Sequence, residues 1–158
     1  MIVWRICKPR HVAVAFDGAA AATFPGGWNK HGQYVVYTSD APSLAVLEML
    51  VNTTPHMLPL FKLFTCGFGD ALITDIGPLP ENWRHLVDPS WLPLQELGFA
   101  CYVSQRSVVP RVPSAIIPDQ SNYILNARHP DFATISIGAA RDLQTDPRLR
   151  STALPAVS

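Results

Sequence analysis

Fifteen prolines are spread along this chain of 158 residues, and they limit the length of every helix and strand that it can form. Proline has no backbone N–H to donate, and its ring clashes with the preceding turn of a helix, so it ends or kinks regular structure. We therefore expect short elements joined by many turns. Strand-like segments dominate and do not alternate regularly with helical ones, which predicts an α+β fold rather than a doubly wound parallel sheet.

Runs of β-branched and aromatic residues indicate the strands, and the turn residues between them indicate where each strand ends. Strands are expected at residues 2–7, 34–38, 58–65, 71–76, 114–117, 123–126 and 132–137. Two helices are expected. The first covers residues 41–51 and can be capped by Ser39 or Asp40, and the second covers residues 90–105 although Gly98 disfavours it.

Two loops and a tail complete the expected organisation. Residues 10–33 are rich in glycine and alanine and are predicted to be an irregular loop, as are residues 78–89. The chain is short enough for a single domain, which we place at residues 1–150. Residues 151–158 are predicted to form a flexible C-terminal tail.

The charge of the chain is balanced, with 12 lysines and arginines against 12 aspartates and glutamates. This balance gives no sign of direct nucleic-acid binding, which needs a basic patch. Apolar residues make up 48% of the chain, whereas the charged share of 15% is low and compatible with a partner covering part of the surface. No apolar run approaches the ~18 residues of a membrane span. Because the N-terminus also lacks the pattern of a secretory signal, a cytoplasmic protein is expected.

The cysteines and histidines do not suggest a metal site. Cys7, Cys66 and Cys101 are odd in number and widely spaced, so they are expected to be reduced thiols in a core. The five histidines show neither HxxxH nor HxH spacing. No metal ligands are therefore predicted, and no cysteine has the surroundings of a nucleophile.

Glu48 is the only charged residue between Ala41 and Thr54, in a segment whose other helical positions are apolar on every face. That pattern is typical of a helix packed inside a domain. A carboxylate buried there without a partner would cost several kcal/mol of desolvation. Either a cleft uses Glu48, or its side chain reaches solvent or pairs with an arginine from elsewhere in the fold.

Four further features could meet Glu48 in one cleft. Arg5 lies within the first apolar strand, and Trp28 follows two glycines that would allow a ligand to approach the backbone. Tyr37 closes the strand that leads into the Glu48 helix, and Ser114 follows a proline where a strand is expected to begin. Each feature also has a purely structural explanation: Arg5 as a side chain that points to solvent from the polar face of its strand, Trp28 and Tyr37 as core residues, and Ser114 as a capping or turn hydroxyl.

Together these stretches resemble the RES-domain toxins, the toxic partners of bacterial toxin–antitoxin pairs. The resemblance is carried by residues 4–6, 26–39, 45–48, 112–116, 122–132 and 146–149. They occur in the order and spacing of the family between about residues 2 and 150. Several separate motifs agreeing in order make this signal far more specific than any one of them.

The resemblance implies a compact single RES domain over residues 1–150, with a split, mostly antiparallel sheet similar to that of ADP-ribosyltransferases. It implies NAD⁺ as a substrate, with no prosthetic group. The toxin would deplete NAD⁺ by cleaving the nicotinamide–ribose bond through hydrolysis or phosphorolysis, or would transfer ADP-ribose to a protein. Its implied partner is a helix-turn-helix, Xre-like antitoxin that blocks the active site, and a homodimer stays open.

Site residues carry over from the same motifs. The resemblance assigns Glu48, Ser114 and Arg5 as catalytic residues, and it assigns Arg5, Trp28, Tyr37, Glu48 and Ser114 to NAD⁺ binding. In this assignment the Glu48 carboxylate stabilises the positive ribose, Arg5 neutralises the pyrophosphate, and Tyr37 stacks against nicotinamide. Ser114 orients Glu48 or the ribose.

One position departs from the family. Where the family reads Gly-Gly-Arg-Trp-Asn, this chain has Gly27 in the place of the arginine. The loss of one charge-assisted contact with phosphate weakens binding by roughly 1.5–3 kcal/mol. Three explanations are open: a weak or inactive member that only binds its antitoxin or a nucleotide, a site served by Arg5 and Lys30 instead, or a residue that is not native.

Overall fold

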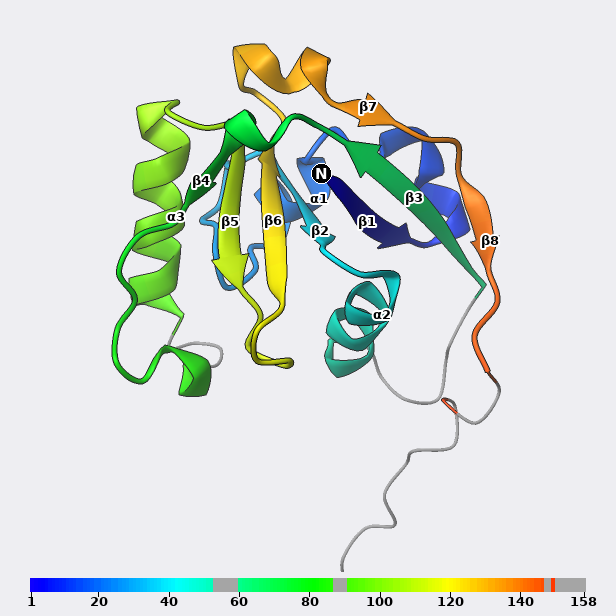
Figure 1. Ribbon diagram of the computed structural model, residues 1–158, viewed down its shortest axis with the longest axis horizontal. Coiled ribbons are helices and arrows are strands. Elements are labelled where there is room, and N and C mark those ends of the chain that lie inside the picture. Colours follow the sequence, from blue (N-terminus) through cyan, green and yellow to red (C-terminus); the bar gives the residue numbers. More distant parts are fainter. Residues whose placement is uncertain (53–59, 87–90, 147–148, 150–158) are drawn as a thin grey trace, which may run out of the picture.

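The computed structural model describes residues 1–52, 60–86, 91–146 and 149, and Figure 1 shows their arrangement. The helices are α1 (Ala19–Thr23), α2 (Pro42–Val51) and α3 (Leu92–Ser104), with short 3₁₀ helices η1 (Pro9–Val14), η2 (Asp70–Leu72), η3 (Trp83–His85) and η4 (Pro130–Thr134). The strands are β1 (Ile2–Cys7), β2 (Val35–Ser39), β3 (Phe61–Gly67), β4 (Ile73–Asp75), β5 (Val109–Pro113), β6 (Ser121–Asn126), β7 (Ser136–Ile137) and β8 (Arg141–Leu143).

The strands form one sheet in the order β4-β5-β6-β2-β1-β3-β7, with β8 paired to β3. Only the pair of β4 and β5 is parallel among the described strands, so the predicted α+β class and mostly antiparallel sheet are confirmed. The order of the strands in the sheet differs from their order in the chain. Strand β1 therefore lies in the middle of the sheet, whereas β7 and β8, which come late in the chain, both pair with β3.

The sheet is divided at its centre. Strand β2 pairs with β6 through five residue pairs and β1 pairs with β3 through six, but β1 and β2 share the single pair Trp4 and Ser39. On one side of this pair the strands separate, and Arg5 spans the gap by donating from Nη1 to the carbonyl oxygen of Tyr37 at 3.0 Å. Helix α2 packs against both strands, in the opening between the two halves (Figure 1).

Helix α2 is less deeply buried than its apolar sequence predicts. Only Leu44 and Ala45 are buried, the residues from Val46 to Leu50 are half-buried, and Val51 is 64% exposed. The prediction of a helix enclosed inside the domain is therefore wrong. One side of α2 covers the junction of β1 and β2, while another side faces a cavity.

Several predicted elements differ from the structure. Residues 10–33 are not wholly irregular, because η1 begins at Pro9 and α1 follows Gly18. The strand predicted at 114–117 is wrong: β5 ends at Pro113, and the next residues form a turn in which Ser114 Oγ accepts the N–H groups of Ile116 and Ile117. The β-branched residues there are set between two prolines, which suits a turn better than a strand.

Two other predicted strands include residues that form 3₁₀ helices in the structure, and two observed strands were not predicted. The segment 71–76 begins in η2 before β4, and the segment 132–137 begins in η4, where Pro130 starts the helix, before β7. Strands β5, at residues 109–113, and β8 were not expected. The start of the strand predicted at 58–65 and the predicted tail at 151–158 lie outside the described residues.

The main core lies under the central strands and contains Val3, Val36, Cys66, Val109 and Leu125. All three cysteines are free; Cys7 and Cys66 are buried and Cys101 is half-buried. Burial raises the pKa of Cys66 to about 12, with a smaller opposing effect from Arg5. In the described part of the chain, no helix has the length and apolar character required to span a bilayer.

Candidate active site

A cavity of about 630 Å³ opens where the two halves of the sheet separate. This volume is in the range of roughly 300–1,000 Å³ that is usual for small-molecule sites. Four of the five predicted site residues line it: Arg5 from β1, Trp28 from the loop after α1, Tyr37 from β2 and Glu48 from α2. The fifth, Ser114, lies directly behind Glu48 and is fully buried.

The Glu48 carboxylate is held by two hydrogen bonds to one of its oxygens. Ser114 Oγ donates to Oε1 at 3.0 Å, and Asn122 Nδ2 donates to the same atom at 2.6 Å. Both donors are neutral, so the carboxylate is fixed in place without being paired to a cation. The alternative of a pairing between Glu48 and an arginine is not found among the described residues.

Ser114 has no acceptor position left for a ligand. Its hydroxyl donates to Glu48, and its two lone pairs accept the backbone N–H groups of Ile116 at 3.1 Å and of Ile117 at 3.1 Å. The turn after β5 thus fixes the hydroxyl, and the hydroxyl fixes the carboxylate. This geometry favours orientation of Glu48 over a direct contact between Ser114 and a substrate.

Arg5 places a positive charge in the cavity wall. Burial lowers the pKa of its guanidinium, and the nearby Cys7, Cys66 and Asp17 oppose that effect. Among the described residues, no carboxylate forms a salt bridge with Arg5, and its Nε is buried without a hydrogen-bond partner. A bound anion would offset the desolvation of this cation.

Tyr37 organises the glycine loop that carries Trp28. Its hydroxyl accepts the N–H of Trp28 at 3.2 Å and donates to Oδ1 of the fully buried Asn29 at 2.8 Å. Burial raises the pKa of Tyr37, so the hydroxyl remains a donor. A Cβ at Gly26 would lie 2.8 Å from the Tyr37 hydroxyl, which explains why this position is a glycine.

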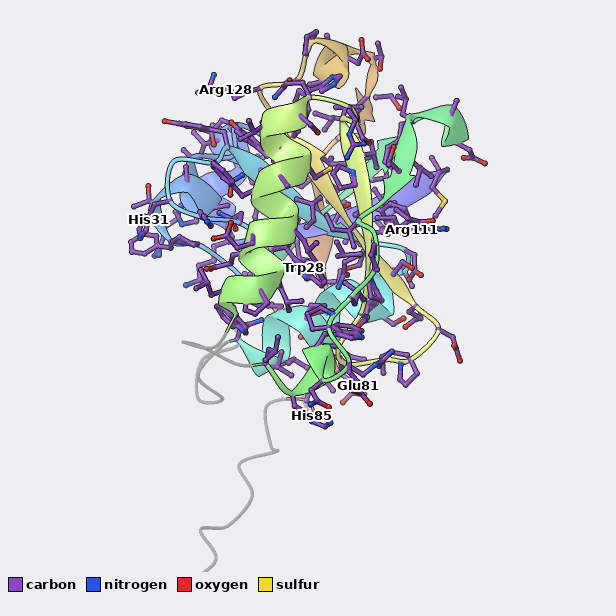
Figure 2. All side chains as sticks on the ribbon, turned by 90° about the vertical axis from the view of Figure 1, so that its left-hand side faces the viewer. Trp28, His31, Glu81, His85, Arg111 and Arg128 are labelled. Carbon is purple, nitrogen blue, oxygen red and sulfur yellow. The ribbon has the colours of Figure 1, made fainter. Side chains whose placement is uncertain are left out.

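Aromatic side chains form one wall of the cavity. The ring of Trp28 lies 6.0 Å from that of Trp83, and Trp91 also lines the cavity. In Figure 2, which looks onto α3, Trp28 lies beside that helix. Trp28 also packs against the core cluster of Val35, Val112 and Ile124. It is therefore both a core residue and part of the cavity wall.

Gly27 lines the cavity, and its backbone is not in the left-handed region. The three described atoms nearest to a Cβ at this position belong to the side chain of Trp91 and begin at 3.8 Å, which is an ordinary contact distance. Lys30, considered as a replacement for the arginine of the family, pairs with Glu96 and lies over the ring of Phe99. Lys30 is also absent from the cavity lining, so among the described residues Arg5 supplies the positive charge at this wall.

Sequence reasoning missed three residues of this site: Asn122, Trp83 and Trp91. Asn122 belongs to a stretch that carried the resemblance, but a neutral amide on a strand gives no chemical signal of its own. Trp83 and Trp91 come from a segment predicted as loop and from the start of a helix. Their position at the cavity follows from long-range packing.

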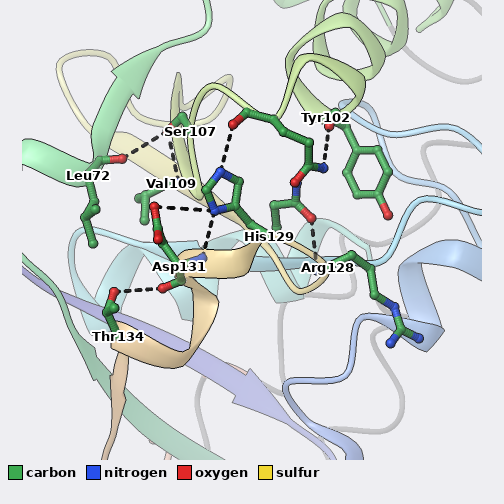
Figure 3. Close-up of polar contacts among 10 residues, drawn as sticks. Leu72, Tyr102, Ser107, Val109, Arg128, His129, Asp131 and Thr134 are labelled. Atoms are coloured by element: carbon green, nitrogen blue, oxygen red, sulfur yellow. Dashed lines mark hydrogen bonds and ion pairs between the residues drawn. The ribbon is translucent and has the colours of Figure 1, made fainter.

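His129, which belongs to the stretch 122–132, has contacts away from the cavity. The ring of His129 accepts the N–H of Asp131 at Nδ1, 3.0 Å away, and its Nε2 lies 2.8 Å from the carbonyl oxygen of Gln105, so Nε2 carries the proton (Figure 3). These contacts join the end of α3 to η4. Neither ring nitrogen is at the cavity, and among the described residues no cluster of possible metal ligands is found.

Comparison with known proteins gives one family and several relatives. The model of the RES domain matches residues 2–146. The chain is 34% identical over 154 residues to "Toxin Res" of Yersinia enterocolitica, which covers 95% of this chain and 100% of that protein. It is 31% identical over 154 residues to a protein of Sphingobium sp. named "Prs ADP-ribosylating toxin", covering 92% of this chain and 94% of that protein.

A solved structure shares the fold. The toxin–antitoxin complex of M. tuberculosis MbcT and MbcA contains a chain that superimposes with a TM-score of 0.72, covering 95% of this chain and 86% of that one. The identity between the two is 18%, so the likeness concerns the fold alone.

Proposed function

Because the chain belongs to the RES domain family, we propose that it is the toxin of a bacterial toxin–antitoxin pair and that it depletes NAD⁺ by cleaving the nicotinamide–ribose bond. The observation that carries this proposal is the Glu48 carboxylate, which lines the cavity and accepts hydrogen bonds from the buried Ser114 behind it and from Asn122 beside it in the cavity wall. Arg5 and the tryptophan wall supply the positive charge and the flat apolar surface that a dinucleotide requires.

The chemistry needs little from the protein at the leaving group. Nicotinamide departs as a neutral molecule from a cationic pyridinium, so no general acid is required. Positive charge then develops at the ribose carbon, as in glycoside hydrolysis. A carboxylate beside that carbon stabilises the charge and can hydrogen-bond a ribose hydroxyl or polarise the attacking nucleophile. Glu48 is held by neutral donors, so its negative charge is available for this purpose.

The other residues bind the two ends of the substrate. Arg5 lies next to the junction of β1 and β2 without a carboxylate partner among the described residues, and a pyrophosphate would balance its charge. Tyr37 holds the Trp28 loop through its hydroxyl, while its ring lines the cavity, where nicotinamide can stack. In this proposal NAD⁺ is a substrate, and no prosthetic group takes part.

The acceptor of ADP-ribose has two candidates. Water or phosphate would give hydrolysis or phosphorolysis. The name of the Sphingobium relative favours a second candidate function, transfer of ADP-ribose to a protein.

For the partner, we propose a helix-turn-helix antitoxin that covers the cavity, and the MbcT–MbcA complex supports an antitoxin of some kind. Such a pair would act in the cytoplasm.

Purified protein incubated with NAD⁺ tests the activity directly. We expect release of nicotinamide, with ADP-ribose as the second product in plain buffer and ADP-ribose 1″-phosphate when phosphate is supplied. Labelled ADP-ribose attached to protein from a lysate would instead establish the transferase. If NAD⁺ binds but no nicotinamide is released in any of these mixtures, the protein is a binding module whose catalysis has decayed.

Restoring the family arginine at Gly27 should strengthen NAD⁺ binding. The position lines the cavity, its backbone accepts a side chain, and Trp91 offers a face for the guanidinium. One or two charge-assisted contacts with pyrophosphate correspond to roughly 10- to 100-fold in affinity. Calorimetric titration of Gly27→Arg with NAD⁺ measures this gain.

Gly69→Arg is the matched control, since it adds the same charge at an exposed glycine whose Cβ position has no neighbour within 4 Å in the part of the chain that the structure describes. An equal gain in both variants would mean a general charge effect. Unchanged affinity in Gly27→Arg, together with brisk NAD⁺ consumption by the parent, would show that Arg5 already provides the phosphate contact and that the pseudoenzyme explanation fails.

A further inference from the structure

We propose that Asn122, held in turn by Ser39, is a positioning residue that fixes the Glu48 carboxylate for catalysis. The proposal rests on the proposed cleavage of NAD⁺ and adds the residue that orients its central group. Asn122 lies on β6 directly opposite Ser39 on β2, so both side chains belong to the same face of the sheet.

The chemistry of the partners determines how the amide is oriented. The ionised carboxylate of Glu48 can only accept, so the group that faces it at 2.6 Å is the Nδ2 donor of Asn122. The Oδ1 atom then faces Ser39, whose Oγ lies 2.7 Å away and donates to it. A directed chain of hydrogen bonds therefore runs from Ser39 through Asn122 to Glu48.

Both bonds to Glu48 end on Oε1, which fixes the rotation of the carboxylate about its last torsion. With Ser114 and Asn122 on Oε1, Oε2 is the oxygen that can meet the ribose at the cavity. The Asn122 amide orients the carboxylate of Glu48 without adding a unit charge. A lysine or arginine in its place would neutralise the carboxylate and weaken the field that it exerts on the developing cation.

The sheet does not depend on this side chain. Five backbone residue pairs join β2 to β6, and β5 pairs with the other side of β6. We therefore expect variants of Asn122 to keep the fold, so that changes in turnover can be assigned to Glu48. The other ionisable groups described in the cavity wall are Arg5, Asp17 and Tyr37, and Asp40 bonds the N–H of Ser121 beside Asn122.

Asn122→Asp provides a test that depends on pH. Above neutral pH the new carboxylate faces Glu48, the two like charges repel, and kcat should fall by about 100-fold with little change in KM. As pH falls the pair shares a proton, and a protonated Asp at this position donates to Oε1 as the amide did. The ratio of variant to parent kcat should therefore recover at least about 10-fold between about pH 8 and about pH 5.5.

Two controls separate positioning from general effects. Gln144→Glu makes the same isosteric change at an exposed amide and should follow the parent at every pH. Ser39→Ala removes the group that holds the Asn122 amide and should lower kcat without a pH-dependent recovery. Equal Tm values by circular dichroism for all variants confirm the fold.

A flat ratio of kcat between Asn122→Asp and the parent across the pH range, in folded protein, would overturn the proposal. The side-chain amide resonances of Asn122 supply a readout without catalysis: in Glu48→Ala they should move upfield as the bond to Oε1 is lost. If the parent does not consume NAD⁺ yet these resonances respond to Glu48, the proposed function fails while the orienting contact stands. If they do not respond, the contact itself is absent.

Discussion

Glu48→Gln is expected to reduce NAD⁺ turnover by about 10²–10³-fold, which corresponds to ~3–4 kcal/mol of transition-state stabilisation. Glutamine keeps the size of the side chain but removes the charge that faces the ribose as it becomes positive. Its amide oxygen can take the place of Oε1 and accept from both Ser114 and Asn122, so the variant removes the charge while keeping the contacts that orient the side chain. The loss should fall on kcat, with NAD⁺ affinity changed only a few-fold.

Steady-state kinetics with quantified nicotinamide release measure this effect, and Glu81→Gln is the control because Glu81 is exposed and absent from the cavity lining. Turnover in Glu48→Gln equal to that of the parent would exclude Glu48 from the chemistry. A large rise in KM at constant kcat would instead assign Glu48 to substrate binding.

Gly98→Ala is expected to destabilise the protein by about 3 kcal/mol, although the same change in an ordinary helix stabilises it by about 1 kcal/mol. Gly98 lies within α3, where the helix approaches the loop that carries Trp28. A Cβ at this position would lie 1.8 Å from the carbonyl oxygen of Trp28 and 2.8 Å from its carbonyl carbon. Both neighbours are backbone atoms, so no rotamer change can relieve the contact.

Urea denaturation of the parent and the variant gives the difference in the free energy of unfolding. Gly69→Ala serves as the control, since none of the described residues comes within 4 Å of its Cβ position and its φ is −69°. Stability that is unchanged or higher in Gly98→Ala would mean that α3 can move outward without cost. In that case the Trp28 wall of the cavity is less firmly held than the contacts suggest.

The sequence indicated Glu48 because an isolated charge in an apolar segment has few purely structural explanations. Ser114 came only from the resemblance to a family, since the residues around it predicted a strand. Pro113 and Pro118 favour the turn that the structure shows, and this turn turned out to orient the hydroxyl. The contact between Ser114 and Glu48 is thus better indicated by the motif around Ser114 than by its predicted secondary structure.

Features that depend on contacts between distant segments were not predictable. Asn122 is a neutral residue on a strand, and its contact with Glu48 spans 74 residues. Strand β8 has three residues and forms by pairing with β3. Gly98 was identified as unfavourable for a helix, but its reason for being glycine is a loop 70 residues earlier in the chain. Local propensity cannot reveal such neighbours.

The central position of β1 in the sheet affects when the site can be assembled during synthesis of the chain. Strand β1 precedes the other described strands in the chain and lies in the middle of the sheet, yet its neighbour across β2, strand β6, begins only at Ser121. The carboxylate at Glu48 precedes its two donors by 66 and 74 residues. A nascent chain therefore carries Arg5 and Glu48 before it carries the groups that orient the Glu48 carboxylate, and the site can be assembled only after β6 has been synthesised.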